Sequence, residues 1–134
     1  MAILPLWALL GLGRALTARI FSKLAGHGVL FLTSRIMLYA VRFFDRPEQF
    51  AVRQAQLPTH IQWLDEHKDA VLVGGSLRHE PGENPVGGLW IVEAPNKAAI
   101  EELLRTDPFW IHGLRERYEI LFWSKAFADR KVPV

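Results

Sequence analysis

The sequence predicts a single α+β domain with the element order β-α-β-β-α-β over residues 37–127. Four short runs of branched and aromatic residues are typical of strands, and clusters of glycine, proline and asparagine separate them. Two segments between these runs are compatible with helices, one after the first run and one after the third. Half of the 134 residues are hydrophobic, which suits one compact domain with an appendage rather than two domains.

The first strand is predicted over residues 38–44 (Leu-Tyr-Ala-Val-Arg-Phe-Phe), and a turn follows at once. Pro47 suits the first position of a helix, with Asp45 near the cap of that helix. The helix is predicted from residue 48 to residue 56. Pro58 either ends this helix or begins a second helical piece, because proline lacks the amide hydrogen that a helix interior needs.

Around Pro58, the spacing of Leu57, Ile61 and Leu64 predicts one apolar face of a helix. His60 lies on the Leu64 side of that face, because residues four apart are neighbours on a helix surface. The sequence therefore predicts a histidine at the start of a short amphipathic helix.

The second half of the domain contains two more strands, a short helix and a last strand. Strands are predicted over residues 70–77 and 86–94, joined by a polar loop that is too long for a tight hairpin turn. A glycine pair lies in each of these strands, and we interpret the pairs as bulges or as close contacts between backbones. A helix is predicted over residues 97–105, and an apolar connector leads to a strand over residues 118–123. Asp107 precedes a proline and so ends the helix.

Two right-handed crossovers predict the ferredoxin-like arrangement, a four-stranded antiparallel sheet with two helices on one face. The other face of the sheet is then uncovered, and an apolar face on a chain this short needs a partner. A second copy of the chain would cover it and form a dimeric α+β barrel, so we predict a homodimer that assembles through the sheet face. The residues assigned to this apolar face are Tyr39, Phe43, Trp90 and Trp123.

Residues 1–36 form an apolar and basic extension, unlike the domain that follows. Neither of its two apolar runs reaches the roughly 18 to 20 residues of a membrane-spanning helix. An acid-free segment of this kind fits an organellar presequence or a helix on a membrane surface, and an extension with no folded role is the third alternative. We expect a cytoplasmic protein if the extension is inert, and an organelle-targeted or membrane-associated protein otherwise. Membrane contact is expected only through residues 1–36, and residues 128–134 are predicted to be a polar tail. The basic residues of the extension are Arg14, Arg19, Lys23 and Arg35.

The composition excludes several classes of function. The chain has no cysteine, which excludes disulfides, thiolate metal sites and thiol nucleophiles. It carries 16 Lys and Arg against 14 Asp and Glu, and the surplus of basic residues lies in the extension. The domain has no basic patch with interleaved aromatics, so we predict no nucleic-acid partner. No His, Asp or Glu residues have metal-ligand spacing such as His-Glu-x-x-His, so we predict neither a metal nor another cofactor.

His60 and Asp107 are the candidate catalytic residues. An imidazole in water titrates at about pH 6.5, so at neutral pH most of it is unprotonated and able to accept a proton. Asp107 would accept a hydrogen bond from the other ring nitrogen and stabilise the imidazolium. Ser76 lacks the Gly-x-Ser-x-Gly elbow of an acyl-transfer enzyme, which favours proton abstraction or elimination instead. The alternative is structural: His60 would bond to a backbone carbonyl, and Asp107 would cap the turn before Pro108.

Five segments of the domain together carry a family resemblance: Met37-Leu38-Tyr39, Pro58-Thr59-His60, Gly74-Gly75-Ser76, Gly88-Leu89-Trp90-Ile91-Val92-Glu93 and Asp107-Pro108-Phe109. Their order and spacing over residues 37–127 resemble the YciI-like, YCII-related family. This resemblance implies the dimeric α+β barrel fold and a His-Asp pair proposed as the active site of the family, which corresponds by position to His60 and Asp107. The family includes a dehydrochlorinase that acts on a chlorinated hydroxyhydroquinone. The chain departs from the family pattern in the short interval after His60 and in the extension.

Two functions follow as hypotheses. The first is a small enzyme that uses the His-Asp pair for proton abstraction, elimination or isomerisation on a small hydroxylated compound, aromatic in the characterised relative. The second is a non-catalytic module that binds a small ligand or a partner protein. A cleft that holds Arg42 or Arg78 would indicate an anionic substrate, although the sequence places neither residue in one. The candidate residues for the wall of the substrate pocket are Gly74, Ser76, Phe109 and Trp110.

Overall fold

The computed structural model of the chain describes residues 35–134, so the predictions for the N-terminal extension lie outside the described residues apart from its last two positions. The predicted order of strands and helices is present, and the apolar connector before the last strand contains one further short helix. No helix of the described residues is long and apolar enough to cross a membrane. The elements are β1 (Met37–Asp45), α2 (Phe50–Glu66), β2 (Val71–Leu77), β3 (Gly87–Ala94), α3 (Lys97–Leu104), α4 (Pro108–Ile111) and β4 (Arg115–Phe122).

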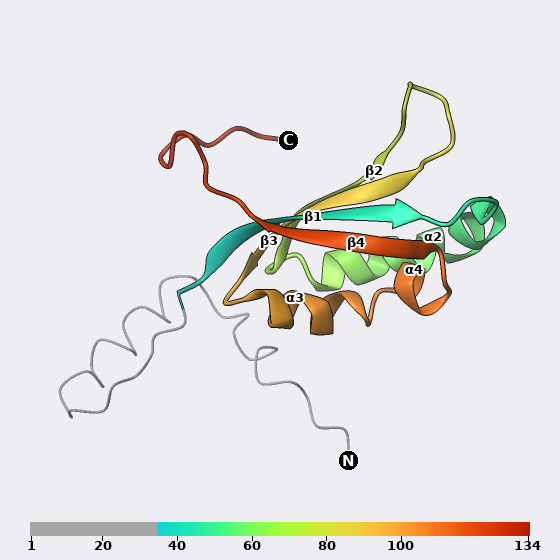
Figure 1. Cartoon of the computed structure of the whole chain (residues 1–134), viewed down its shortest axis with the longest axis horizontal. Helices are drawn as coiled ribbons and strands as arrows, with labels where there is room; N and C mark the ends of the chain where they lie inside the picture. Colours follow the sequence, from blue (N-terminus) through green and yellow to red (C-terminus); the bar gives the residue numbers. More distant parts are fainter. Residues whose placement is uncertain (1–34) are drawn as a thin grey trace, which may run out of the picture. The chain divides into compact units, whose positions relative to one another are not determined.

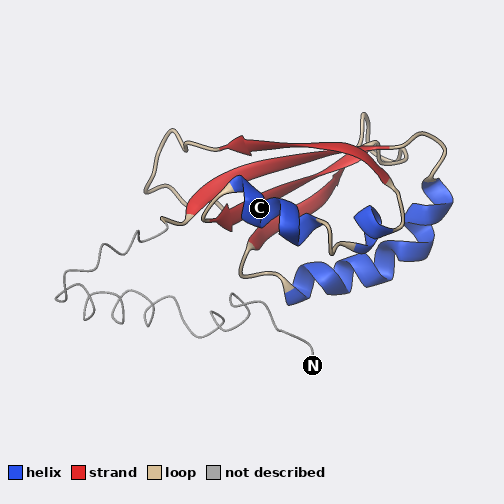
Figure 2. Ribbon diagram, turned by 60° about the horizontal axis from the view of Figure 1, so that its bottom comes forward, coloured by secondary structure: helices blue, strands red, loops and turns tan. Residues whose placement is uncertain are grey.

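The four strands form one antiparallel sheet in the order β2-β3-β1-β4, with β3 and β1 in the centre. Helices α2, α3 and α4 all lie on the same side of this sheet (Figures 1 and 2). The short helix α4 turns the chain from the helical layer into β4. The predicted fold class, a ferredoxin-like α+β domain with a four-stranded antiparallel sheet, is confirmed.

The core lies between the sheet and the helices, and it contains aromatic residues that the sequence analysis assigned to the other face. Tyr39, Phe43 and Trp90 are buried in this core, so their assignment to the uncovered face is wrong. Side chains alternate along a strand, so an error of one residue moves every side chain to the opposite face. Trp123 follows β4 directly and is 42% exposed.

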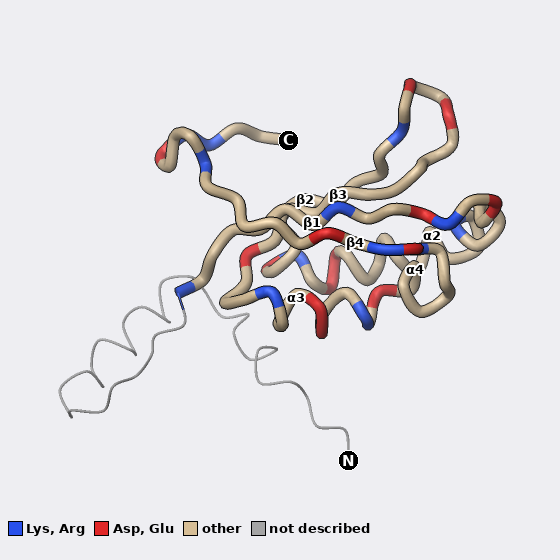
Figure 3. The backbone as a smooth tube through the Cα atoms, viewed as in Figure 1, with Lys and Arg blue, Asp and Glu red and all other residues tan. Residues whose placement is uncertain are grey.

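The sheet face away from the helices is open in this domain and is of mixed character. Arg42 of β1 lies opposite Glu119 of β4. The guanidinium carbon of Arg117 lies 3.4 Å from the centroid of the Phe44 ring. Basic and acidic positions follow one another along β4 (Figure 3). The open face also carries Glu93, which lies opposite Leu38. Apolar residues at other positions of this face include Ala40, Leu89, Ile91 and Leu121.

Helix α2 runs without a break through Pro58, so both predictions for this proline are wrong. Proline leaves the carbonyl four residues earlier without its helical partner. Pro58 lies on the exposed side of the helix, where solvent can bond to that carbonyl. The helix also begins after Pro47, and Asp45 is the last residue of β1 instead of a cap. His60 therefore lies in the middle of a long helix and not at the start of a short one.

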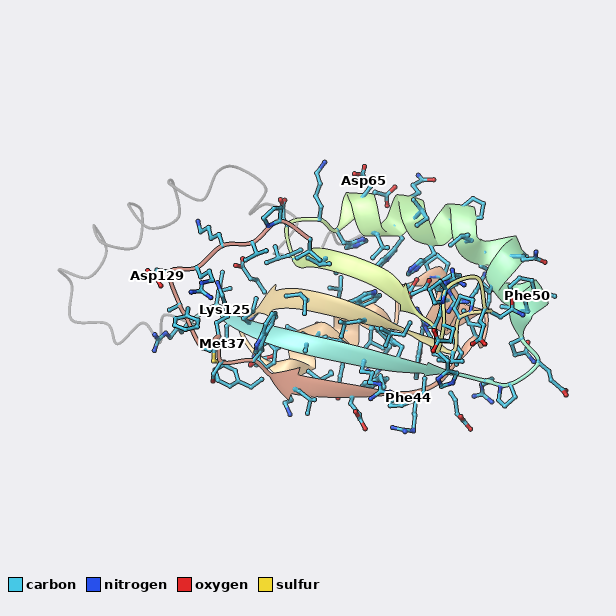
Figure 4. The ribbon with its side chains drawn as sticks, turned by 90° about the horizontal axis from the view of Figure 1, so that it is seen from above. Met37, Phe44, Phe50, Asp65, Lys125 and Asp129 are labelled. Carbon is cyan, nitrogen blue, oxygen red and sulfur yellow. The ribbon has the colours of Figure 1, made fainter. Side chains whose placement is uncertain are left out.

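The buried face of α2 also differs from the predicted face. Leu57 and Ile61 are 41% and 55% exposed. Arg53, His60 and Trp63 are buried, at spacings of seven and three residues that place them on one side of the helix. Figure 4 shows α2 lying along the sheet, and the ring of Trp63 stacks on a tryptophan of β3. The helix therefore contributes two polar groups and an indole to the interior.

Glycines allow close packing at two positions of the sheet. A Cβ at Gly74 would lie 3.2 Å from Cδ2 of Leu64, so this glycine lets α2 approach β2. A Cβ at Gly87 would lie 2.0 Å from the carbonyl oxygen of Phe43. The pairing of β2 with β3 is irregular at the start of β2, whereas both glycine pairs have regular partners. The interpretation of the glycines as bulges is therefore wrong, and the close-contact interpretation describes Gly74 and Gly87.

Gly87→Ala is expected to lower the free energy of unfolding by about 3 kcal/mol or more, because the added methyl group overlaps the backbone of β1. Gly75→Ala is the matched control, since a Cβ at Gly75 meets no atom within 4 Å. Its effect is expected to stay below about 1 kcal/mol. Urea denaturation followed by tryptophan fluorescence measures both variants, and equal stability would contradict the role assigned to Gly87.

Candidate active site

His60 and Asp107, the candidate catalytic residues, are in direct contact. Nδ1 of His60 lies 2.6 Å from Oδ1 of Asp107, and the two residues are 6% and 0% exposed. Asp107 is the N-cap of α4, where the same Oδ1 accepts the backbone N–H of Phe109 at 3.1 Å. Aspartate suits this position because its oxygen satisfies a backbone N–H that has no partner within the helix. The contact therefore joins the middle of α2 to the start of α4.

The contact determines which nitrogen of the imidazole carries the hydrogen. An ionised carboxylate only accepts hydrogen bonds, so Nδ1 of His60 donates and Nε2 keeps its lone pair. The ring is also stacked on Phe109, with centroids 3.9 Å apart and planes inclined by 17°. Trp63 lies nearly parallel to the imidazole at a centroid distance of 6.5 Å. Hydrogen bonding and stacking thus hold the imidazole in one orientation.

A second cluster of buried polar side chains surrounds Asp45, and the sequence did not predict it. Oδ1 of Asp45 accepts a hydrogen bond from Nη1 of Arg115 at 2.6 Å, and Oδ2 accepts one from Nη2 of Arg53. None of the three side chains is more than 7% exposed. Burial lowers the pKa of Arg115, and the charge of Asp45 opposes that shift. Because arginine still stays protonated, this Asp45 cluster (Asp45, Arg53 and Arg115) contains two positive charges and one negative charge.

Phe109 separates the Asp45 cluster from His60. The guanidinium carbons of Arg53 and Arg115 lie 5.1 Å and 5.0 Å from the centroid of the Phe109 ring, which also stacks on His60. Gly88 leaves room for Arg115, since a Cβ there would lie 3.0 Å from Nη2 of that arginine. The cations therefore rest against an aromatic ring, which attracts them through its π electrons.

A small cavity of about 50 Å³ lies beside the imidazole. Gly74, Ser76 and Phe109, three of the four residues predicted for the pocket wall, line it. Trp110 does not line it, because its ring lies edge-on to Tyr118 with centroids 5.4 Å apart. No carboxylate contributes to the lining. The charged and polar residues of the lining are Arg53, His60, Ser76 and Arg115.

The lining of this small cavity is unsuited to a metal cation. Two of its polar groups are guanidinium groups, which repel cations, and Nδ1 of His60 is already engaged by Asp107. In the part of the chain that the structure describes, no three His, Asp or Glu side chains form a potential metal site. That the chain uses no cofactor stays a prediction from the sequence.

The family model of the YCII-related domain matches residues 37–124. The chain belongs to the YCII-related domain family. The family resemblance noted in the sequence is therefore confirmed, and it extends over the whole sheet and all three helices of the domain.

Solved structures of other proteins resemble this YCII-related domain, and two of them are informative about its relatives. The 5-chloro-2-hydroxyhydroquinone dehydrochlorinase of Burkholderia phenoliruptrix AC1100, in complex with 2,5-dihydroxybenzoquinone, is 27% identical, with a TM-score of 0.60. The match covers 66% of this chain and 94% of that one. An antibiotic biosynthesis monooxygenase-like protein of Bacteroides thetaiotaomicron is 18% identical, with a TM-score of 0.47 and coverage of 74% and 97%. No curated protein matches the chain.

Sequence reasoning missed the Asp45 cluster of this YCII-related domain for identifiable reasons. Arg53 stands seven residues before His60, and this spacing places the two on one side of a helix, which is a usable signal. Asp45 stands in a turn-like segment, where it resembles a helix cap. Arg115 is 70 residues further along the chain, so no local pattern connects the two.

Asp45→Asn is expected to lower the free energy of unfolding by about 3 to 5 kcal/mol, because it leaves two buried guanidinium groups without a countercharge. Asp65→Asn is the matched control, since the Asp65 carboxylate is 78% exposed and lies 3.7 Å from Nζ of Lys68. Its effect is expected to stay below about 1 kcal/mol. Urea denaturation followed by circular dichroism measures both, and a loss at Asp45 no larger than at Asp65 would contradict the prediction.

Proposed function

We propose that this YCII-related domain is a small enzyme that removes a proton from its substrate. His60 is the general base, and Asp107 is the residue that positions it. The buried contact of 2.6 Å between Nδ1 of His60 and Oδ1 of Asp107, beside a cavity that His60 lines, is the observation that carries this proposal. Nε2 is the ring nitrogen that remains to accept a proton.

In the proposed step, Nε2 of His60 forms a bond to the substrate proton, and the bond between that proton and the substrate breaks. The electron pair that is released forms a new π bond. In an elimination, the leaving group departs with the electron pair of its own bond; in an isomerisation, the imidazolium returns the proton to a different substrate atom. Asp107 stabilises the imidazolium in both cases, and its effect is large because the pair is nearly sealed from water.

The proposed substrate class rests on the likeness to the dehydrochlorinase, whose name gives 5-chloro-2-hydroxyhydroquinone as its substrate. Loss of HCl from such a compound fits the proposed step, since the base takes the proton and chloride leaves with the electron pair of the C–Cl bond. We therefore propose a small hydroxylated aromatic compound as the substrate.

Chloride release from 5-chloro-2-hydroxyhydroquinone tests this function. His60→Asn is expected to lower kcat/KM by about 100-fold or more, because the variant has no base. Asp107→Asn still offers an oxygen to the N–H of Phe109 but no longer fixes the imidazole tautomer. It is expected to lower kcat by about 10- to 100-fold and to change KM by less than about threefold, as a loss confined to the transition state does.

His112→Asn is the matched control for these variants. His112 is exposed at the end of α4 and does not line the small cavity, so its variant is expected to retain the wild-type kcat/KM. If the wild type releases no chloride, the same variants are compared in a screen of hydroxylated aromatic compounds. Equal turnover by the wild type and His60→Asn would remove His60 from the mechanism and would favour a module that only binds its ligand.

We also propose that the enzyme is a homodimer that assembles through the open sheet face. Membership of the YCII-related family, whose resemblance implies the dimeric α+β barrel fold, supports this assembly. Apolar residues of β1, β3 and β4 share the open face with Arg42 and Glu119, which lie opposite one another. A two-fold axis brings the same patch of each copy together, so a patch with both charges is able to pair with itself.

Leu89→Glu is expected to convert the dimer into monomers, because Leu89 lies on the open face of the central strand β3 and a carboxylate there would be buried without a partner. Ile111→Glu is the matched control, since Ile111 is 62% exposed on α4 in the helical layer. Sedimentation equilibrium measures the mass of both variants. A wild type that stays monomeric at micromolar concentrations would contradict the proposed assembly.

A further inference from the structure

A larger cavity, of about 290 Å³, adjoins the small cavity beside His60. It lies between the first turns of α2 and residues 78–86, the loop that joins β2 to β3. In Figure 4, the start of α2 at Phe50 and this loop lie at the same end of the sheet. Residues of α2 and β2 line both cavities, so a single ligand is able to occupy the two together. The shared residues are Arg53, Leu57 and Ser76.

The sizes of the two cavities indicate that different parts of one ligand occupy them. The small cavity, at about 50 Å³, has room for a reacting group but not for a whole substituted ring. The larger cavity approaches the lower limit of about 300 Å³ that is usual for small-molecule sites. A substrate that reaches His60 therefore extends its remaining part into the larger cavity.

Arginine side chains provide most of the charge around both cavities. Arg53 and Arg78 line the larger cavity, and Arg53 and Arg115 line the small one. Glu83 is the one carboxylate among these lining residues, and it belongs to the exposed loop between β2 and β3. The surroundings of a bound ligand are therefore mainly positive.

The two arginines of the larger cavity are held in different ways. Arg53 is 5% exposed and donates hydrogen bonds to Asp45 and to Oγ of Ser76, the latter at 3.3 Å. Arg78 is exposed, and its Nη1 donates to the backbone carbonyl of Glu83 at 2.6 Å. No carboxylate of residues 35–134 forms an ion pair with Arg78. Arg53 therefore supplies a fixed charge and Arg78 an adaptable one.

Within the Asp45 cluster, two buried guanidinium groups share a single carboxylate. Asp107, a second buried carboxylate, also acts on Arg115 through its charge, but it is hydrogen-bonded to His60 and lines neither cavity. Nε of Arg115 is buried and has no hydrogen-bond partner within residues 35–134. A buried N–H without a partner and the burial of two guanidinium groups both cost free energy, and an anion bound next to these arginines would offset part of that cost.

We infer that the larger cavity is a subsite for a carboxylate of the substrate, which Arg53 and Arg78 bind while the reacting group lies beside His60. The inference rests on the proposed function and specifies its substrate class: a hydroxylated aromatic acid rather than a neutral phenol. A guanidinium group presents parallel N–H donors that match the two oxygens of a carboxylate. Arg78 is thus a specificity-determining residue for the substrate.

Equilibrium binding of two matched probes tests this inference without requiring turnover. The probes are 2,5-dihydroxybenzoate and 1,4-dihydroxybenzene, which differ by the carboxylate, and titration calorimetry at low salt measures both. The wild type is expected to bind the benzoate at least about tenfold more tightly than the neutral probe, since a hydrogen bond to a charged group contributes that much. Arg78→Gln is expected to reduce this preference to less than about threefold.

Arg105→Gln is the matched control, because Arg105 is an exposed arginine at the end of α3 that lines neither cavity. It is expected to keep the wild-type preference. His60→Asn is also expected to keep the preference, because both arginines of the subsite remain. Loss of turnover in the His60 variants and loss of anion preference in Arg78→Gln are therefore separate outcomes.

Three results would overturn the carboxylate subsite. They are equal affinity of the wild type for the two probes, undetectable binding of the benzoate, and an unchanged preference in Arg78→Gln. If the turnover assay shows that His60 is not the base, the comparison of the two probes remains valid. The probes differ only in the carboxylate that the arginines would bind.

Discussion

The candidate active site depends on one buried carboxylate, that of Asp45. It stands at the end of β1 and binds Arg53 of α2 and Arg115 of β4, so it connects three elements that are far apart in the sequence. Arg53 and His60 lie on the same side of α2, and the ion pair therefore fixes the rotation of the helix about its own axis. That rotation brings His60 within hydrogen-bond distance of Asp107. The geometry of the proposed base is thus set by a charge pair that takes no part in the chemistry.

The Asp45 cluster holds a helix in place at a large cost in desolvation free energy. Removing charges from water costs several kcal/mol per ion, and apolar residues of similar size often give equal or greater stability. The cluster also joins two guanidinium groups to one carboxylate, and Nε of Arg115 has no hydrogen-bond partner among residues 35–134. Both features are explained if the two arginines bind a ligand. Arg53 and Arg115 line the small cavity beside His60, whereas Asp45 does not line it.

Element order was predictable from the sequence, whereas the faces of the elements were not. Glycine and proline positions separate the strands clearly enough to give the sheet. In β1, bulky residues such as Phe43 and Phe44 follow one another, so alternation does not reveal which side is buried. In α2, the buried residues include Arg53 and His60, and a search for an apolar face selects the exposed Leu57 and Ile61 instead. The pairing of His60 with Asp107 followed from family resemblance, and the Asp45 cluster depends on long-range contacts that no local pattern shows.

Asp107 has two roles that make different demands on the side chain. As the N-cap of α4 it has to offer an oxygen to the N–H of Phe109, and serine, threonine or asparagine would do this equally well. As the partner of His60 it has to be a carboxylate, because only a negative charge stabilises the imidazolium. Its second oxygen, Oδ2, is buried and has no hydrogen-bond partner among residues 35–134, which costs stability that a neutral cap would not. A helix cap alone does not account for this cost, whereas the proposed stabilisation of a protonated His60 by Asp107 does.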